Sequence, residues 1–257
     1  MPAIQHDGKR SWEERAATKG RTLSGVLYRG FSEPLNRYVH DWHVAAVVDQ
    51  LLPLLPRGGL VLDLGCGYGR IRAPVAAARP DLRIVGMDFS QNYCRMYAAT
   101  QKAATVCADV NRMPFAHEVF DGIIGVTCLM YIERARRAER IPQILEVLKP
   151  GGHALFIDPG LEFMRLARLG LRSTRETPTG GIGFLLREYR KLDAGPQHRV
   201  HALGAMPAFT AMLPALYATT KNATVTRYLL RVAQRLDFGT RAFGRLSLQR
   251  WALIGPR

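Results

Sequence analysis

Residues 61–70, VLDLGCGYGR, decide how this chain folds. A short apolar run carries Asp63 and ends in three glycines at alternating positions, Gly65, Gly67 and Gly69. An apolar run closed by glycines is typical of a strand that is buried on both faces. Because glycine has no side chain, it lets the backbone come close to a ligand. We therefore expect a bound ligand at the end of this strand.

Strand-like and helix-like segments alternate around this stretch. Strands are expected at 59–65, 83–90, 104–110, 120–132 and 153–160, and helices at 34–55, 71–80, 91–103 and 134–152. The alternation indicates an α/β fold, doubly wound, with a mostly parallel sheet and helices on both faces. Ligands of such sheets bind beyond the carboxyl ends of the strands, so the residues that finish each strand are the candidates for chemistry.

The spacing of the glycines excludes two phosphate-binding motifs. A P-loop needs GxxxxGK[ST], and no Lys, Ser or Thr stands where that motif requires one. A dinucleotide fingerprint, GxGxxG, needs a third glycine at the position that Arg70 occupies. A glycine loop with an acid two residues before it suits a ligand that carries positive charge and no phosphate. S-adenosylmethionine (SAM), with its ammonium and sulfonium groups, meets both conditions.

With its further motifs, the segment 60–160 resembles the class I SAM-dependent methyltransferases. The motifs are VLDLGCGYG, IVGMD, ADVNRMPF, FDGIIGV and VLKPGGHALFID, in this order along the chain. The resemblance implies SAM as the cofactor and a seven-stranded sheet whose last strand, near 246–254, is antiparallel. It also implies helical elements before and after the core.

The same resemblance assigns residues to the cofactor. Asp63 would hold the methionine end, and Asp88 would accept hydrogen bonds from both ribose hydroxyls. Phe89 would lie against the adenine, and Asp109 would receive the adenine amino group. Each acid alone is equally well a cap or a turn residue, so the inference depends on their order at successive strand ends. The full set is Asp63, Gly65, Cys66, Gly67, Asp88, Phe89, Asp109, Val110 and Thr127.

The residues after the fourth strand bear on the methyl acceptor. TCLMYI lacks the Asn/Asp-Pro-Pro-Tyr/Phe motif of enzymes that methylate exocyclic amines, and it lacks the Pro-Cys that methylates cytosine C5. Cys128 is therefore interpreted as a packing residue. A hydroxyl acceptor also needs a base. Tyr131 and His201 are the candidates, with a structural role for Tyr131 left open, whereas His153 is expected at the wrong end of its strand.

The net charge of +15 is concentrated in the last third of the chain. Residues 160–257 hold 16 Lys and Arg against 5 Asp and Glu. Only 6 of the basic residues in the chain are lysines. Such a bias indicates either a GC-rich genome or a basic face for phosphates or an anionic surface. An RNA methyltransferase is therefore one alternative function, and a catalytically silent cofactor-binding protein is another.

We expect the chain to comprise three segments with different functions. Residues 1–45 form a helical cap, residues 46–160 the cofactor-binding core, and residues 161–257 an acceptor lid with the final strands. The uncharged segment 202–220 is interpreted as an apolar acceptor wall or a packed lid helix. Its prolines, glycine and threonines argue against a membrane span.

Further helices are expected near 161–169 and 224–236. No metal site is expected, because His40 and His43 lack a third ligand in a recognisable spacing. We therefore expect a cytoplasmic enzyme with reduced cysteines. It would methylate a small-molecule or lipid-like acceptor by in-line displacement.

Overall fold

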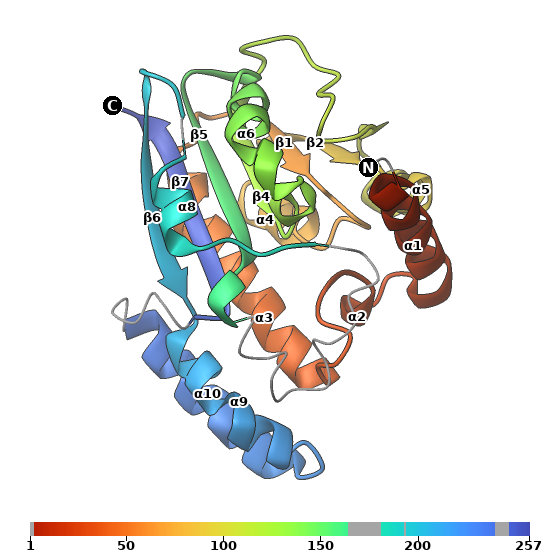
Figure 1. The fold of residues 1–257 in the computed structure, drawn as a ribbon, viewed down its shortest axis with the longest axis vertical. Helices are drawn as coiled ribbons and strands as arrows, with labels where there is room; N and C mark the ends of the chain where they lie inside the picture. Colours follow the sequence, from red (N-terminus) through yellow and green to blue (C-terminus); the bar gives the residue numbers. More distant parts are fainter. Residues whose placement is uncertain (1–2, 164–180, 193, 240–246) are drawn as a thin grey trace.

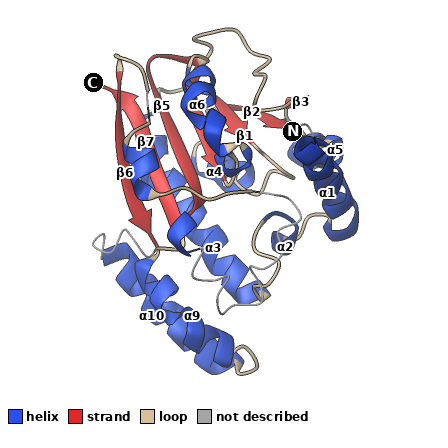
Figure 2. Ribbon diagram, in the orientation of Figure 1, coloured by secondary structure: helices blue, strands red, loops and turns tan. Residues whose placement is uncertain are grey.

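The structure is a computed structural model, and it describes residues 3–163, 181–192, 194–239 and 247–257. Its centre is a seven-stranded sheet of order β3-β2-β1-β4-β5-β7-β6, with helices on both faces (Figures 1 and 2). The strands are β1 Leu60–Leu64, β2 Arg83–Asp88, β3 Thr105–Cys107, β4 Phe120–Val126, β5 Leu148–Pro159, β6 His198–Ala205 and β7 Gln249–Pro256.

The strand directions confirm the expected fold class. The pairs β1–β2, β2–β3, β1–β4 and β4–β5 are parallel. Strand β7 runs antiparallel to both of its neighbours, β5 and β6. The carboxyl ends of β1 to β6 therefore share one edge of the sheet with the amino end of β7.

The described helices surround this sheet. They are α1 Ala3–Lys19, α2 Leu23–Val26, α3 Glu33–Ala46, α4 Arg72–Ala78, α5 Gln91–Gln101, α6 Arg137–Leu145, α8 Leu186–Arg190, α9 Pro207–Ala218 and α10 Ala223–Gly239. The expected helix 34–55 is α3 continued by a π-helical turn, Val47–Leu51, and a 3-10 turn, Leu52–Leu54. None of these described helices combines the length and the apolar content that crossing a membrane requires.

Alternation along β1 builds a core on each face of the sheet. Leu62 and Leu64 pack with the apolar residues of α6 and α8. Val61, which directly precedes Leu62, packs on the opposite face with α4 and the end of α3. All three side chains are no more than 1% exposed, as the period of two in a strand covered on both faces requires.

The C-terminal hairpin of α9 and α10 packs against α3 as a third core. Phe209 stacks on Tyr38 with ring centroids 4.5 Å apart. Tyr38 Oη donates to Asp237 Oδ2 over 2.6 Å, and the backbone N–H groups of Ala208 and Phe209 also donate to this carboxylate. The apolar segment 202–220 thus supplies the end of β6 and a helix that packs on α3 and α10.

Several elements differ from the sequence expectations. Strand β4 ends at Val126, not at 132, because Thr127 takes a left-handed conformation with φ 58° that turns the chain. Strand β5 already begins at Leu148, where a helix end was expected, because Leu148 pairs with Phe120 across an irregular register. Strand β6 was not expected. From residue 164 on, the helix expected near 161–169 lies outside the described residues.

Candidate active site

The glycine loop lies at the carboxyl end of β1. Gly65, Gly67 and Gly69 all have positive φ angles, of 68°, 53° and 87°. A Cβ on Gly65 would stand 2.9 Å from both Cβ and Sγ of Cys128. The N–H groups of Gly65 and Cys66 donate to Met87 O over 2.8 and 3.0 Å, so the loop is tied to the end of β2. Glycine is required here both by backbone conformation and by space.

Two buried acids flank this loop. Asp63 and Asp88 are 4% and 8% exposed. Asp88 accepts hydrogen bonds from Gly67 N and Ser90 N, each over 2.9 Å. Asp63 Oδ2 is buried and has no hydrogen-bond partner among the described residues. Burial raises the pKa of Asp63 to about 7 and that of Asp88 to about 6. A desolvated carboxyl with an unpartnered oxygen is a site that a cationic group completes.

The remaining residues assigned to the cofactor lie at the same edge or beside it. Cys66 is buried, and Phe89 packs with the aromatic cluster around Tyr93. Asp109 Oδ1 accepts from Asn111 N in an exposed turn after β3. This turn is tied to the end of β2 by the hydrogen bond from Ala108 N to Asp88 O, over 3.0 Å.

Val110 and Thr127 close the set. Val110 packs against the core on the α6 face. Thr127 Oγ1 donates to Val126 O over 2.7 Å, and its N–H donates to Ile157 O. Their side chains are therefore occupied by packing and local hydrogen bonding, which leaves mainly backbone groups to face a ligand.

The structure separates the two candidate bases. Tyr131 ends the 3-10 turn after β4, and its ring packs edge-on against Trp12 with centroids 5.5 Å apart. His201 is exposed in the middle of β6, opposite Leu253, with its ring 5.7 Å from that of Trp251. Strands β4, β5 and β7 stand between β1 and β6. The structure thus brings Tyr131, but not His201, to the edge that carries the glycine loop.

The N-terminal helices cover this edge, which the sequence reading placed only as a cap. Helix α1 lies beside α5, with α2 next to it (Figure 1). Trp12 contacts both Tyr93 and Tyr131 edge-on. A Cβ on Gly67 would stand 3.3 Å from Val26 Cγ1 of α2. Arg15 holds the two helices together, because it donates to Ser24 O and Leu27 O and lies over the Trp12 ring.

A second buried polar cluster lies within the carboxyl end of β5 and the amino end of β7. Asp158 is fully buried and accepts from Met130 N over 3.0 Å and from Tyr189 Oη over 2.5 Å. Burial raises the pKa of Asp158 to about 7. Gln249 Nε2 donates to Tyr28 Oη over 3.0 Å, and Gln249 Oε1 is buried without a partner among the described residues. Asp158 ends the quoted VLKPGGHALFID motif, but its partners come from segments that the sequence does not connect to it.

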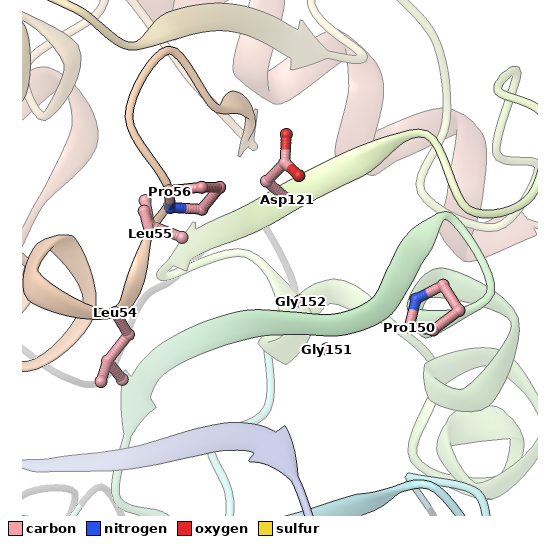
Figure 3. Close-up of a pocket in the computed structure, with 7 residues that line it drawn as sticks. All are labelled: Leu54, Leu55, Pro56, Asp121, Pro150, Gly151 and Gly152. Atoms are coloured by element: carbon pink, nitrogen blue, oxygen red, sulfur yellow. The ribbon is translucent and has the colours of Figure 1, made fainter.

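Two cavities lie away from this edge. One, of about 360 Å³, lies at the amino ends of β4 and β5 and is lined by Leu54, Leu55, Pro56, Asp121, Pro150, Gly151 and Gly152 (Figure 3). Its one carboxylate, on Asp121, is bound by Lys149 Nζ and Leu60 N. The other, of about 350 Å³, lies between α6 and α8, and its basic lining residues are Arg134, Arg137, Arg187 and Lys191.

Comparison with known proteins identifies the core. Residues 61–152 match a family model described as a methyltransferase domain. A mouse tRNA (carboxymethyluridine(34)-5-O)-methyltransferase is 33% identical over 107 residues, which are 41% of this chain and 15% of that protein. An O-methyltransferase of Aspergillus nomiae is 30% identical over 115 residues, covering 40% of this chain and 50% of that one. The chain thus matches half or less of the length of these curated relatives.

Solved structures share the fold over nearly the whole chain. A Haloferax volcanii methyltransferase in complex with the Trm112 methyltransferase activator has a TM-score of 0.62 at 18% identity, covering 95% of this chain and 96% of that one. The plantazolicin methyltransferase BpumL in complex with S-adenosylhomocysteine (SAH) has a TM-score of 0.59 at 17% identity, covering 99% of both chains. Together with the sheet order and the match over 61–152, these likenesses give one conclusion. Residues 61–152 match a methyltransferase domain, and the chain has the class I fold of solved methyltransferases, one of which holds SAH.

Proposed function

We propose that the protein transfers the methyl group of SAM to a small-molecule acceptor with a reactive hydroxyl, by in-line displacement. The observation that carries this proposal is the aromatic cover over the glycine loop, in which Trp12 of α1 packs on Tyr131 beside the buried acids. A covered, largely apolar site suits a small acceptor held with few polar contacts. Residues 1–45 would form this cover, and α9 and α10 would support it through α3.

The residues of the edge suit SAM. The unpartnered Asp63 Oδ2 would hold the ammonium group. Asp88 would receive the ribose hydroxyls, because each carboxylate oxygen that accepts one backbone N–H can accept a second donor. Asp109 would take the adenine amino group. When bound, SAM supplies an electrophilic methyl group to the acceptor.

The protein would contribute alignment and exclusion of water. Holding the acceptor oxygen in line with the methyl group supplies much of the rate acceleration in such a displacement. Tyr131 is the residue that we assign to the acceptor, since it follows β4 and contacts Trp12 of the cover. The position of His201 gives no support to a role at this edge. Asp158, which is buried and has a raised pKa, would add a polar group on the acceptor side of the site.

The test measures binding and transfer separately. Calorimetry with SAH should give micromolar affinity, typical of an enzyme ligand. Radiolabelled SAM should then label the small-molecule or lipid fraction of a cell extract. In Tyr131→Phe, SAH affinity should stay within about twofold while transfer falls. Absence of SAH binding, or labelling confined to tRNA, would contradict the proposal.

A second candidate is methylation of tRNA. It rests on the cleft between α6 and α8, where basic side chains gather, and on the relatives named as tRNA methyltransferases. In this case the cleft would bind the phosphate backbone, while the same glycine loop held SAM. The two candidates differ in the salt dependence of acceptor binding.

A further inference from the structure

Arg70 is the first residue after the glycine loop, and its side-chain contacts among the described residues are to two histidines. Its Nη1 lies 3.3 Å from His43 Nδ1 and 3.4 Å from His40 Nδ1. These are long contacts to uncharged rings, since burial and the charge of Arg70 lower the pKa of His40 to about 4 and that of His43 well below its ordinary value. Within the described ranges, no carboxylate forms an ion pair with Arg70.

The unpaired acid of the site lies close to this arginine. The positive charge of Arg70 opposes the effect of burial on the pKa of Asp63. Asp63 keeps an unpartnered buried oxygen, and the Arg70 side chain is only partly exposed. One end of the glycine loop therefore holds a carboxylate and the other a guanidinium, and neither forms an ion pair among the described residues. Leaving both unpaired in a desolvated site is costly.

An amino-acid group satisfies both charges at once. The methionine portion of SAM carries an α-ammonium and an α-carboxylate on one carbon. We propose that Arg70 binds the α-carboxylate of this portion while Asp63 holds its α-ammonium. The planar fork of a guanidinium fits a carboxylate bidentately, which a lysine ammonium does not. This assignment rests on the proposed function, because it concerns the same cofactor.

The competing explanation is structural, in which Arg70 only joins the glycine loop to α3 through its two histidine contacts. Two ligands separate the explanations. SAH carries the whole amino-acid portion, whereas 5′-methylthioadenosine carries the adenosine and lacks the amino-acid portion. Loss of a side chain that binds the carboxylate should weaken the binding of SAH alone, whereas a distorted loop should weaken the binding of both ligands.

The experiment is calorimetry of both ligands with the full chain and with Arg70→Met. SAH affinity should fall about 10- to 100-fold, because the substitution removes the donor of a charge-assisted hydrogen bond to the carboxylate. Affinity for 5′-methylthioadenosine should stay within about twofold. The control is Arg72→Met. Arg72 also lowers the pKa of Asp63 through its charge, but it donates to Gln101 Oε1. Here SAH affinity should fall no more than about threefold.

A second comparison does not depend on how the methionine variant folds. Decarboxylated SAM keeps the ammonium and lacks only the carboxylate. The unmodified protein should bind it about 10- to 100-fold more weakly than SAM, and Arg70→Lys should narrow that gap. Equal affinity for the two ligands, or parallel loss of SAH and 5′-methylthioadenosine in Arg70→Met, would overturn the assignment. Failure of the unmodified protein to bind SAH would instead contradict the proposed function.

Discussion

Gly65 and Gly58 have nearly the same backbone angle but different surroundings. Their φ angles are 68° and 70°. A Cβ on Gly65 would meet Cys128 at 2.9 Å, whereas a Cβ on Gly58 would meet nothing within 4 Å. The pair therefore separates the cost of a left-handed backbone from the cost of lost space.

Gly58→Ala should lower the free energy of unfolding by about 1–2 kcal/mol, the cost of the backbone conformation alone. Gly65→Ala should add about 1–3 kcal/mol for overpacking against Cys128. It should also weaken SAH binding, because the loop must move to make room. Urea unfolding and calorimetry check both results. Equal destabilisation by the two variants would show that Cys128 moves aside at no measurable cost in stability.

Asp63 should make cofactor binding depend on pH. Its pKa in the folded protein is raised to about 7, so the unliganded protein takes up a proton as the pH falls below 7. The ammonium of the ligand needs the ionised carboxylate, so that proton must leave on binding. SAH affinity should therefore be constant above pH 8 and fall by about tenfold per pH unit below 7. Below about pH 6, Asp88 should add a second loss.

Asp63→Asn is the control for this pH profile. It should bind SAH weakly at every pH and lose the decline that begins near pH 7. Calorimetry between pH 5.5 and 8.5 measures both curves. A wild-type affinity that stays constant between pH 8 and 6 would place the ammonium elsewhere.

At the scale of elements, α1 is held on the core through the start of α5. Glu13 accepts from Gln91 N over 2.6 Å and from Asn92 N over 3.2 Å. Ser90 Oγ accepts from Tyr93 N over 3.2 Å. The first N–H groups of α5 are thus satisfied partly by its own cap and partly by a different helix.

Glu13→Ala should lower the free energy of unfolding by about 0.5–2 kcal/mol, the usual cost of a lost N-terminal cap. Its neighbour Glu14 pairs with Arg10 on an exposed face, so Glu14→Ala should lower the free energy of unfolding by less than about 0.5 kcal/mol. If α1 covers the cofactor, Glu13→Ala should also speed SAH dissociation in stopped-flow fluorescence of Trp12. Identical behaviour of the two variants would contradict a docking role for Glu13.

The sequence predicts elements best where they are buried on both faces. Strand β1 reads as an apolar run, because its alternating side chains all meet a core. The same signal extends β4 too far, since Leu129 and Met130 of the following 3-10 turn are apolar and buried without belonging to a strand. Strand β6 is missed for the opposite reason. It lies at the edge of the sheet, and six of its eight residues are exposed or partly exposed.

The sequence likewise predicts one part of the candidate site and not the other. Asp63 and Asp88 can be found from the sequence, because each stands at the end of a strand that the sequence itself marks. The cover cannot, since it depends on contacts such as Glu13 with Gln91, which lie 78 residues apart. Tyr28 and Gln249 are separated by 221 residues, and no local sequence pattern predicts their hydrogen bond.

At the scale of the whole molecule, the basic side chains of the cleft between α6 and α8 distinguish a tRNA acceptor from a small-molecule acceptor. Arg134 in the cleft between α6 and α8 is paired with Glu188 at 2.6 Å. Arg187 and Lys191 are exposed there and form no ion pair within the described part of the chain. These two residues are the free cations that a phosphate backbone would meet first.

Arg187→Glu/Lys191→Glu is the test, with Arg231→Glu on the exposed face of α10 as a control of like sign. If tRNA is the acceptor, its affinity should fall steeply between 50 and 200 mM salt, and the double variant should flatten the slope by about 2. For a small acceptor we expect methyl transfer unchanged in both variants. Filter binding across salt concentrations, beside the transfer assay, distinguishes the outcomes.

The hydrogen bond between Tyr38 and Asp237 limits how this protein can be recombined with its relatives. It joins α3, before the cofactor core in the chain, to α10, after it, and the same carboxylate receives two N–H groups of α9. A hybrid that took only the N-terminal segment or only the C-terminal hairpin from another methyltransferase would bury a phenol or a carboxylate without its partner. In a hybrid, the two flanks would therefore have to be exchanged as one unit around a core that can stay in place.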